Sequence, residues 1–193
     1  YIQNFGSFEP SGITKAEDLV TLMAAKAQLL SKIIEKALNE DHTKGIQTDL
    51  TDQLTAFSNV LIHDISAKDF ADMYAQTITY GLFTARYHDP TLPTFSRQEA
   101  YQLLPASNPF LKKLFGYIAG MEVDTRISWV IDDLVQMYLA CDVAQMLASY
   151  GKDASKDPIV HFYEDFLEAF DPQVRKDLGV WYTPLPVVNF TVR

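Results

Sequence analysis

The chain has 193 residues, 48% of them hydrophobic, and a formal net charge of -9. This size and hydrophobic content are sufficient for a domain with its own core. The charge is opposite in sign to that required by nucleic-acid phosphates, so we expect that this chain is not the main DNA-binding part of a protein. No apolar run approaches the about 18 residues of a membrane-spanning helix, so we expect no membrane partner.

The beginning of the chain and its single cysteine bear on the cellular setting. The first residue is Tyr1, and no secretory signal pattern follows it, so we expect a cytoplasmic piece of a longer polypeptide. Cys141 has no partner for an internal disulfide, which suits a reducing compartment. Because its neighbours are apolar, we interpret Cys141 as a small core residue.

The first half of the chain is patterned for helices. Apolar residues recur at spacings of three and four, and the starts carry capping residues. Three helices are predicted: from the capping box Thr14–Glu17 to about Asn39, from about Leu50 to Ile62, and from Ser66 to His88 before Asp89-Pro90. Gly81 lies inside the third helix and weakens it by about 1 kcal/mol relative to Ala, so we expect another element to approach closely there.

Prolines and capping residues divide the second half. We predict a short helix from Ser96 to Leu104, a helix from Asn108-Pro109 to Gly120, a helix capped by Asp124 that continues to about Tyr150, and helices starting at Asp157-Pro158 and Asp171-Pro172, the last ending at Gly179. The first 178 residues show no convincing period-two pattern. The predicted fold is therefore an all-α bundle of seven to nine helices with a short extended C-terminal segment.

The last fifteen residues, 179–193, differ from this body. Gly179 to Tyr182 is predicted to be an extended approach to a further helix, which Thr183 would cap and Pro184 would begin. The chain reaches Arg193 only a few residues later, so we expect it to be cut at a domain boundary.

Candidate catalytic and metal-binding residues are sparse. The four histidines, His42, His63, His88 and His161, are scattered and have no metal-site spacing, so we expect no metal. His161 and Glu164 would share a helix face, which allows acid–base work but favours a surface or capping pair. The adjacent Asp132 and Asp133 point about 100° apart and should not address one substrate atom. We assign no catalytic residue.

Two further clusters have a functional and a structural interpretation. Arg86, Arg97, Lys112 and Lys113 could form a basic patch, but we expect a solvated face because no aromatic residues interleave with them. Phe162, Phe166 and Phe170 could stack on bases, but their i, i+4, i+8 spacing favours a buried helix face that seats the segment 179–188.

The C-terminal motifs resemble a known family. The run Asp157 to Leu167, the Asp171-Pro172 helix and the segment Gly179-Val180-Trp181-Tyr182-Thr183-Pro184 look like the junction before the catalytic domain of fused restriction–modification polypeptides. These Type ISP and Type IIG enzymes join a nuclease to an N6-adenine DNA methyltransferase. Residues 75–86 and 108–111 also resemble the helical spacer, or coupler, of these proteins.

The resemblance implies a division of the chain and a cofactor site. Residues 1–178 would be the helical spacer domain, and residues 179–193 would be the first segment of a truncated methyltransferase domain. Tyr182, Thr183 and Pro184 would bind S-adenosylmethionine in the parent protein, with the helix N-terminus receiving its carboxylate. Trp181 departs from the tyrosine that the family has there.

Other family motifs are missing from the chain. The glycine-rich cofactor loop and the Asn-Pro-Pro-Tyr-type motif that holds the flipped adenine do not occur. We therefore expect neither methyl transfer nor cofactor binding by these 193 residues alone. The expected partners are adjoining methyltransferase and nuclease or motor domains, and DNA through the parent protein. The alternative is a free-standing helical module that binds another protein.

Overall fold

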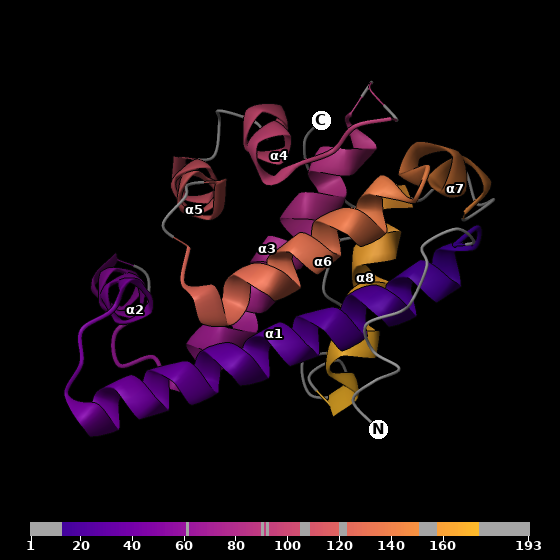
Figure 1. The fold of residues 1–193 in the computed structure, drawn as a ribbon. Coiled ribbons are helices and arrows are strands. Elements are labelled where there is room, and N and C mark those ends of the chain that lie inside the picture. The colour runs from indigo at the N-terminus through magenta and orange to yellow at the C-terminus, as the bar shows by residue number, and fades with distance from the viewer. Residues whose placement is uncertain are drawn as a thin grey trace, which may run out of the picture. The chain divides into compact units, whose positions relative to one another are not determined.

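In the computed structural model the chain is helical. The structure describes residues 13–60, 62–89, 91, 93–104, 109–119, 123–150 and 158–173. Within these ranges it has no strand and eight helices (Figure 1): α1 Ala16–Lys44, α2 Asp49–Val60, α3 Ala67–Tyr87, α4 Arg97–Leu103, α5 Pro109–Ala119, α6 Thr125–Leu139, α7 Val143–Ser149 and α8 Pro158–Phe170. The prediction of an all-α fold is confirmed.

Side-chain caps explain where several helices begin. The Ser66 hydroxyl accepts a hydrogen bond from the backbone N–H of Asp69 at 3.0 Å, and Ser96 caps α4 in the same way. Asp124 accepts a backbone N–H at the start of α6. Each bond satisfies an amide that has no partner inside its helix. The predicted starts are confirmed at these three positions, and α1 begins inside the predicted capping box.

Helix α1 is longer than predicted. It continues to Lys44 rather than ending near Asn39, because Asp41 in its last turns is buried and forms an ion pair with Arg126 of α6. Gly45 then ends the helix at φ 63°, a left-handed conformation that glycine adopts without steric cost. The residues after Asn39 are polar, which is typical of a loop. They are helical here because Arg126, which is distant in the sequence, pairs with Asp41.

The single helix predicted from Asp124 to about Tyr150 is wrong in its middle. Helices α6 and α7 are separated by a three-residue break, at the end of which Asp142 caps α7. Arg86 of α3 takes the carbonyls of Tyr138 and Leu139, which a continuous helix would have bonded to its own next turn. The break therefore has two causes: the local cap of α7 by Asp142, and the hydrogen bonds from the distant Arg86 to the last carbonyls of α6.

The chain divides into two compact units, and α1 contributes residues to both. One unit is Lys26–Leu139, and the other combines Tyr1–Ala25 with Ala140–Arg193. The predicted boundary between residues 1–178 and 179–193 lies outside the described residues, so it stays a prediction.

The Lys26–Leu139 unit is built around α3 and α6. The two helices face each other with buried aromatic and aliphatic side chains, and the Tyr138 hydroxyl donates a hydrogen bond to the Thr79 carbonyl at 2.9 Å. Ion pairs join α6 to α1 at Lys26–Asp133 and at Asp41–Arg126, so α6 runs antiparallel to this part of α1, as Figure 1 shows.

Gly81 marks a close contact between α3 and α5, as the sequence predicted. A Cβ atom at this position would lie 2.5 Å from Cε2 of Phe115, whose side chain is fully buried. A carbon atom cannot approach that closely, so any larger residue would force the ring or the helix to move. Packing explains the glycine.

In the second unit, α8 turns its aromatic residues inward. Phe162, Phe166 and Phe170 are buried, which confirms their interpretation as a core face, and Cys141 is buried as well. The segment 179–188 that they were expected to seat lies outside the described residues. Asp171 accepts a backbone N–H from Gln173, as predicted for a helix start. No helix in the described ranges is long and apolar enough to cross a membrane.

Candidate functional site

Arg86 does not belong to a solvated basic patch, and that expectation is corrected. Its side chain is 1% exposed, and its Nε donates to the Tyr138 carbonyl at 3.0 Å while Nη2 donates to the Leu139 carbonyl at 3.3 Å. These are the last carbonyls of α6, where a positive charge is favourable. Arg86 is a cap for α6.

The rest of the guanidinium is held by the loop between α3 and α4. Nη1 forms an ion pair with Asp89 at 2.8 Å, and the group lies over the ring of Phe95 at 5.4 Å. Burial disfavours the ionised carboxyl, but hydrogen bonds from Thr91 and from Arg86 outweigh it and hold the pKa of Asp89 below its ordinary value. The charge is satisfied internally, so it is not offered to a phosphate.

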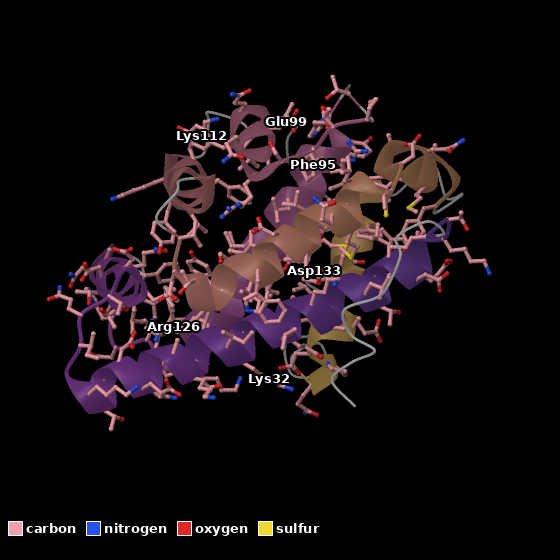
Figure 2. The ribbon with its side chains drawn as sticks, viewed as in Figure 1. Lys32, Phe95, Glu99, Lys112, Arg126 and Asp133 are labelled. Atoms are coloured by element: carbon pink, nitrogen blue, oxygen red, sulfur yellow. The ribbon has the colours of Figure 1, made fainter. Side chains whose placement is uncertain are left out.

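The other members of the predicted patch also differ in role. Lys112 donates to the Leu104 carbonyl at 3.2 Å and lies 4.3 Å from the centre of the Tyr101 ring, so it helps to cap α4. Figure 2 shows Lys112 beside α4, where Phe95 and Glu99 also lie. Arg97 forms an ion pair with Asp132 at 3.0 Å. The expectation of a solvated face considered only aromatic residues interleaved along the chain, whereas Phe95 and Tyr101 reach Arg86 and Lys112 from other elements.

A second arginine centre joins α1 to α6. Arg126 forms a bidentate pair with Asp41, both distances being 2.8 Å, and its Nε donates to Asp124 at 3.0 Å (Figure 2). The hydrogen bonds of Arg126 are the largest cause that lowers the pKa of both carboxyl groups, against the effect of burial. The arrangement stabilises the helix pair and keeps all three groups charged.

The adjacent aspartates Asp132 and Asp133 point to different partners. Asp132 pairs with Arg97 of α4, and Asp133 pairs with Lys26 of α1. The two adjacent side chains therefore point in different directions, as their spacing predicted.

His161 and Glu164 lie on one face of α8, as predicted. The distance from His161 Nδ1 to Glu164 Oε2 is 3.7 Å, and both side chains are about one third exposed. His161 Nδ1 is buried and has no hydrogen-bond partner among the described residues, so at this distance the two side chains do not form a hydrogen bond. The described residues contain no group of three or more histidine, cysteine, aspartate or glutamate side chains that could hold a metal ion.

Two tyrosines, Tyr74 and Tyr117, also have perturbed pKa values. Burial is the first cause that raises the pKa of Tyr74 and Tyr117, and neighbouring charges add to the effect. Both phenols therefore stay protonated near neutrality, and neither can serve as a general base there.

A groove of about 650 Å³ lies between the C-terminal end of α1 and α2. We call it the α1–α2 groove. Leu38, Ile46 and Leu54 supply its apolar surface, and Asp41 and Asp52 lie among its polar residues. The sequence did not predict this site, because its lining residues belong to two helices and the turn between them, and the sequence pattern does not show how these elements pack. One sequence feature could have drawn attention to this region: residues Gly45 to Ala67 include three aspartates and no lysine or arginine.

A second depression, of about 510 Å³, runs along the exposed side of α1 from Lys32 to Lys44. Its lysines and glutamates alternate, and Glu40 lies 3.8 Å from both Lys36 and Lys44. Because it is formed by one helix, with its three lysines and two glutamates spread along the exposed surface, it provides no convergent group for chemistry.

The predicted cofactor-binding residues Tyr182, Thr183 and Pro184 lie outside the described residues. Their assignment to S-adenosylmethionine therefore stays a prediction. Comparison of the chain with models of known families, with characterised proteins and with solved structures gave no match.

Proposed function

We propose that this chain is a non-catalytic helical spacer in a fused restriction–modification polypeptide, where it joins a nuclease or motor part to an N6-adenine DNA methyltransferase part. The observation that carries the proposal is the order of the motifs: a helical body, the helix that begins at Asp157-Pro158, and then the segment Gly179 to Pro184. In this proposal the parent protein uses S-adenosylmethionine, modifies adenine and cuts DNA.

The roles of the charged residues support a mechanical rather than a catalytic task. Arg86 joins α3 to the end of α6, and Arg126 joins α6 to α1. Asp132 and Asp133, the adjacent carboxylates of α6, are each paired with a cation on another helix. Groups that are committed to neighbouring helices stabilise a fixed body, which is what a spacer requires.

The length of α1 also suits a spacer. It has 29 residues, so it is about 43 Å long at 1.5 Å per residue, and it contributes to both compact units. Backbone hydrogen bonds tie each turn of a continuous helix to the next, so α1 joins by one element the residues that it contributes to the two units.

The test is S-adenosylmethionine binding by two proteins: the 193-residue chain, and a longer polypeptide that continues through the proposed methyltransferase domain. Isothermal titration calorimetry should detect binding by the longer polypeptide only. In that polypeptide, Thr183→Val should weaken binding about tenfold, because a hydrogen bond to a charged group contributes about 1.5 kcal/mol. Thr191→Val, eight residues further on, is the matched control and should leave the affinity unchanged.

Two results would contradict the proposal. Tight binding by the 193-residue chain would show that the missing glycine-rich loop is unnecessary. A reading frame that ends at Arg193 would favour the alternative, a free-standing module for protein binding. The observation in favour of that alternative is the α1–α2 groove, in which Ile46 is 50% exposed.

A further inference from the structure

Helix α2 leaves part of its apolar surface exposed, although Phe57 packs edge-on against Phe70 with ring centroids 5.5 Å apart. Of its side chains that the structure describes, only Leu50 is buried, whereas Leu54 and Phe57 are half-buried. Ile46, in the turn before it, is 50% exposed. A surface helix ordinarily buries a continuous apolar stripe against its domain. Here part of that stripe faces the α1–α2 groove.

The groove is large enough to receive side chains of a partner. Its volume of about 650 Å³ falls within the range of roughly 300–1,000 Å³ that is typical of ligand sites. Leu38 of α1 is only 3% exposed, so the apolar surface open to a partner comes mainly from Ile46 in the turn and from the half-buried Leu54 of α2. Recognition of an amphipathic helix uses grooves of this kind, into which residues at i, i+3 or i+4 and i+7 insert.

The charges around the groove select the chemistry of the occupant. Asp49 and Asp52 both lie in the first turn of α2, and Asp52 is the one that lines the groove. No lysine or arginine occurs from Gly45 to Ala67. Within the groove, Asp41 is already neutralised by Arg126, whereas Asp52 accepts a hydrogen bond from the uncharged Gln47 at 2.6 Å.

We infer that the α1–α2 groove binds a basic amphipathic helix of a protein partner, with the partner's apolar face on Ile46 and Leu54 and its lysines or arginines beside Asp49 and Asp52. Nucleic acid does not fit, because phosphates would meet aspartates. A second copy of this chain does not fit well either, because each copy has a net charge of -9. The inference does not rest on the spacer function, since such a groove would bind a basic helix in either kind of protein.

The experiment uses the 193-residue chain and a display library of random peptides of about 15 residues, roughly four helical turns. Selection should enrich peptides that combine lysine or arginine with apolar residues at helical spacing. Ile46→Ser should weaken the selected peptides about tenfold, since covering a half-exposed isoleucine contributes about 1.4 kcal/mol. Asp52→Asn should weaken them about threefold and reduce the salt dependence, as expected for an exposed charge pair.

The matched control is Ile62→Ser. Ile62 is 46% exposed, almost the same as Ile46, but it is not among the residues that line the groove. We expect this variant to bind the selected peptides with unchanged affinity and to retain the helical circular dichroism of the parent chain. Ile46→Ser should retain it too, because Ile46 lies in the turn between two helices.

Several results would overturn the inference. One is a library that yields no binder, or only neutral and acidic peptides. Another is equal weakening by Ile46→Ser and Ile62→Ser, which would indicate non-specific attraction to an acidic chain. Light scattering that shows a dimer lost in Ile46→Ser would assign the groove to self-association, and duplex DNA binding lost in the same variant would assign it to nucleic acid.

Discussion

At the scale of single residues, the same residue type takes opposite roles according to what approaches it. The sequence around Arg86 suggests a solvated helix position. In the structure the side chain is buried and donates hydrogen bonds to the carbonyls of Tyr138 and Leu139. These partners are 52 and 53 residues away in the chain. Local patterning cannot identify such a partner, so burial of a charged residue is the least predictable property of this protein.

The two helical glycines give a matched pair of substitutions. Gly81→Ala places Cβ against the buried ring of Phe115, and overpacking costs about 1–3 kcal/mol against a helix gain of about 1 kcal/mol. Gly116→Ala places Cβ at an ordinary 3.4 Å from Tyr101 and only gains helix propensity. Urea denaturation should show a loss of about 1 kcal/mol for Gly81→Ala and a gain of about 0.5–1 kcal/mol for Gly116→Ala. Equal effects would show that the α3–α5 contact is looser than the structure has it.

At the scale of elements, helix starts were predictable and helix ends were not. Ser66, Ser96 and Asp124 cap their helices through bonds to amides two or three residues away, so the sequence contains the whole interaction. The end of α1 and the break after α6 depend on Arg126 and Arg86, which come from other helices. The same limit applies to the candidate site, because the α1–α2 groove exists only where two helices and a turn meet.

The bridge between α1 and α6 should make stability depend on pH. Asp41 and Asp124 have pKa values below the ordinary 3.8 in the folded chain, so each contributes stability above that value and loses it as the pH falls through the folded pKa. Asp41→Asn should cost about 2 kcal/mol at pH 7, since hydrogen bonds to charged groups contribute about 1.5–3 kcal/mol. The difference from the parent chain should shrink below about pH 4.

Thermal or urea unfolding of both proteins at a series of pH values measures this effect. Asp64→Asn is the control, because Asp64 is exposed in a turn at φ 61° and asparagine tolerates that conformation. It should leave the pH profile unchanged. A cost for Asp41→Asn that is constant from pH 7 to about pH 3 would mean that the side chain acts through its shape and not through its charge.

At the scale of the whole molecule, the proposed spacer function implies that other domains of the parent protein contact and modify DNA. Its net charge is -9, and of the four cations in the predicted patch, Arg86 is buried, Arg97 pairs with Asp132 and Lys112 caps α4. Only Lys113 is an exposed lysine for which the structure assigns no such role. A body with this charge distribution would position neighbouring domains and leave phosphate contacts to them.

We therefore expect the isolated chain not to bind duplex DNA in a salt-dependent way. Fluorescence anisotropy of a labelled duplex should stay flat at low ionic strength, because the affinity of DNA-binding proteins scales with the number of phosphates they neutralise. The longer polypeptide with the proposed methyltransferase domain is the positive control and should bind with a steep salt slope. A steep slope for the isolated chain would place DNA contacts on the spacer itself. The acidic α1–α2 groove would then have to lie on a face turned away from the duplex, since it would repel the phosphates.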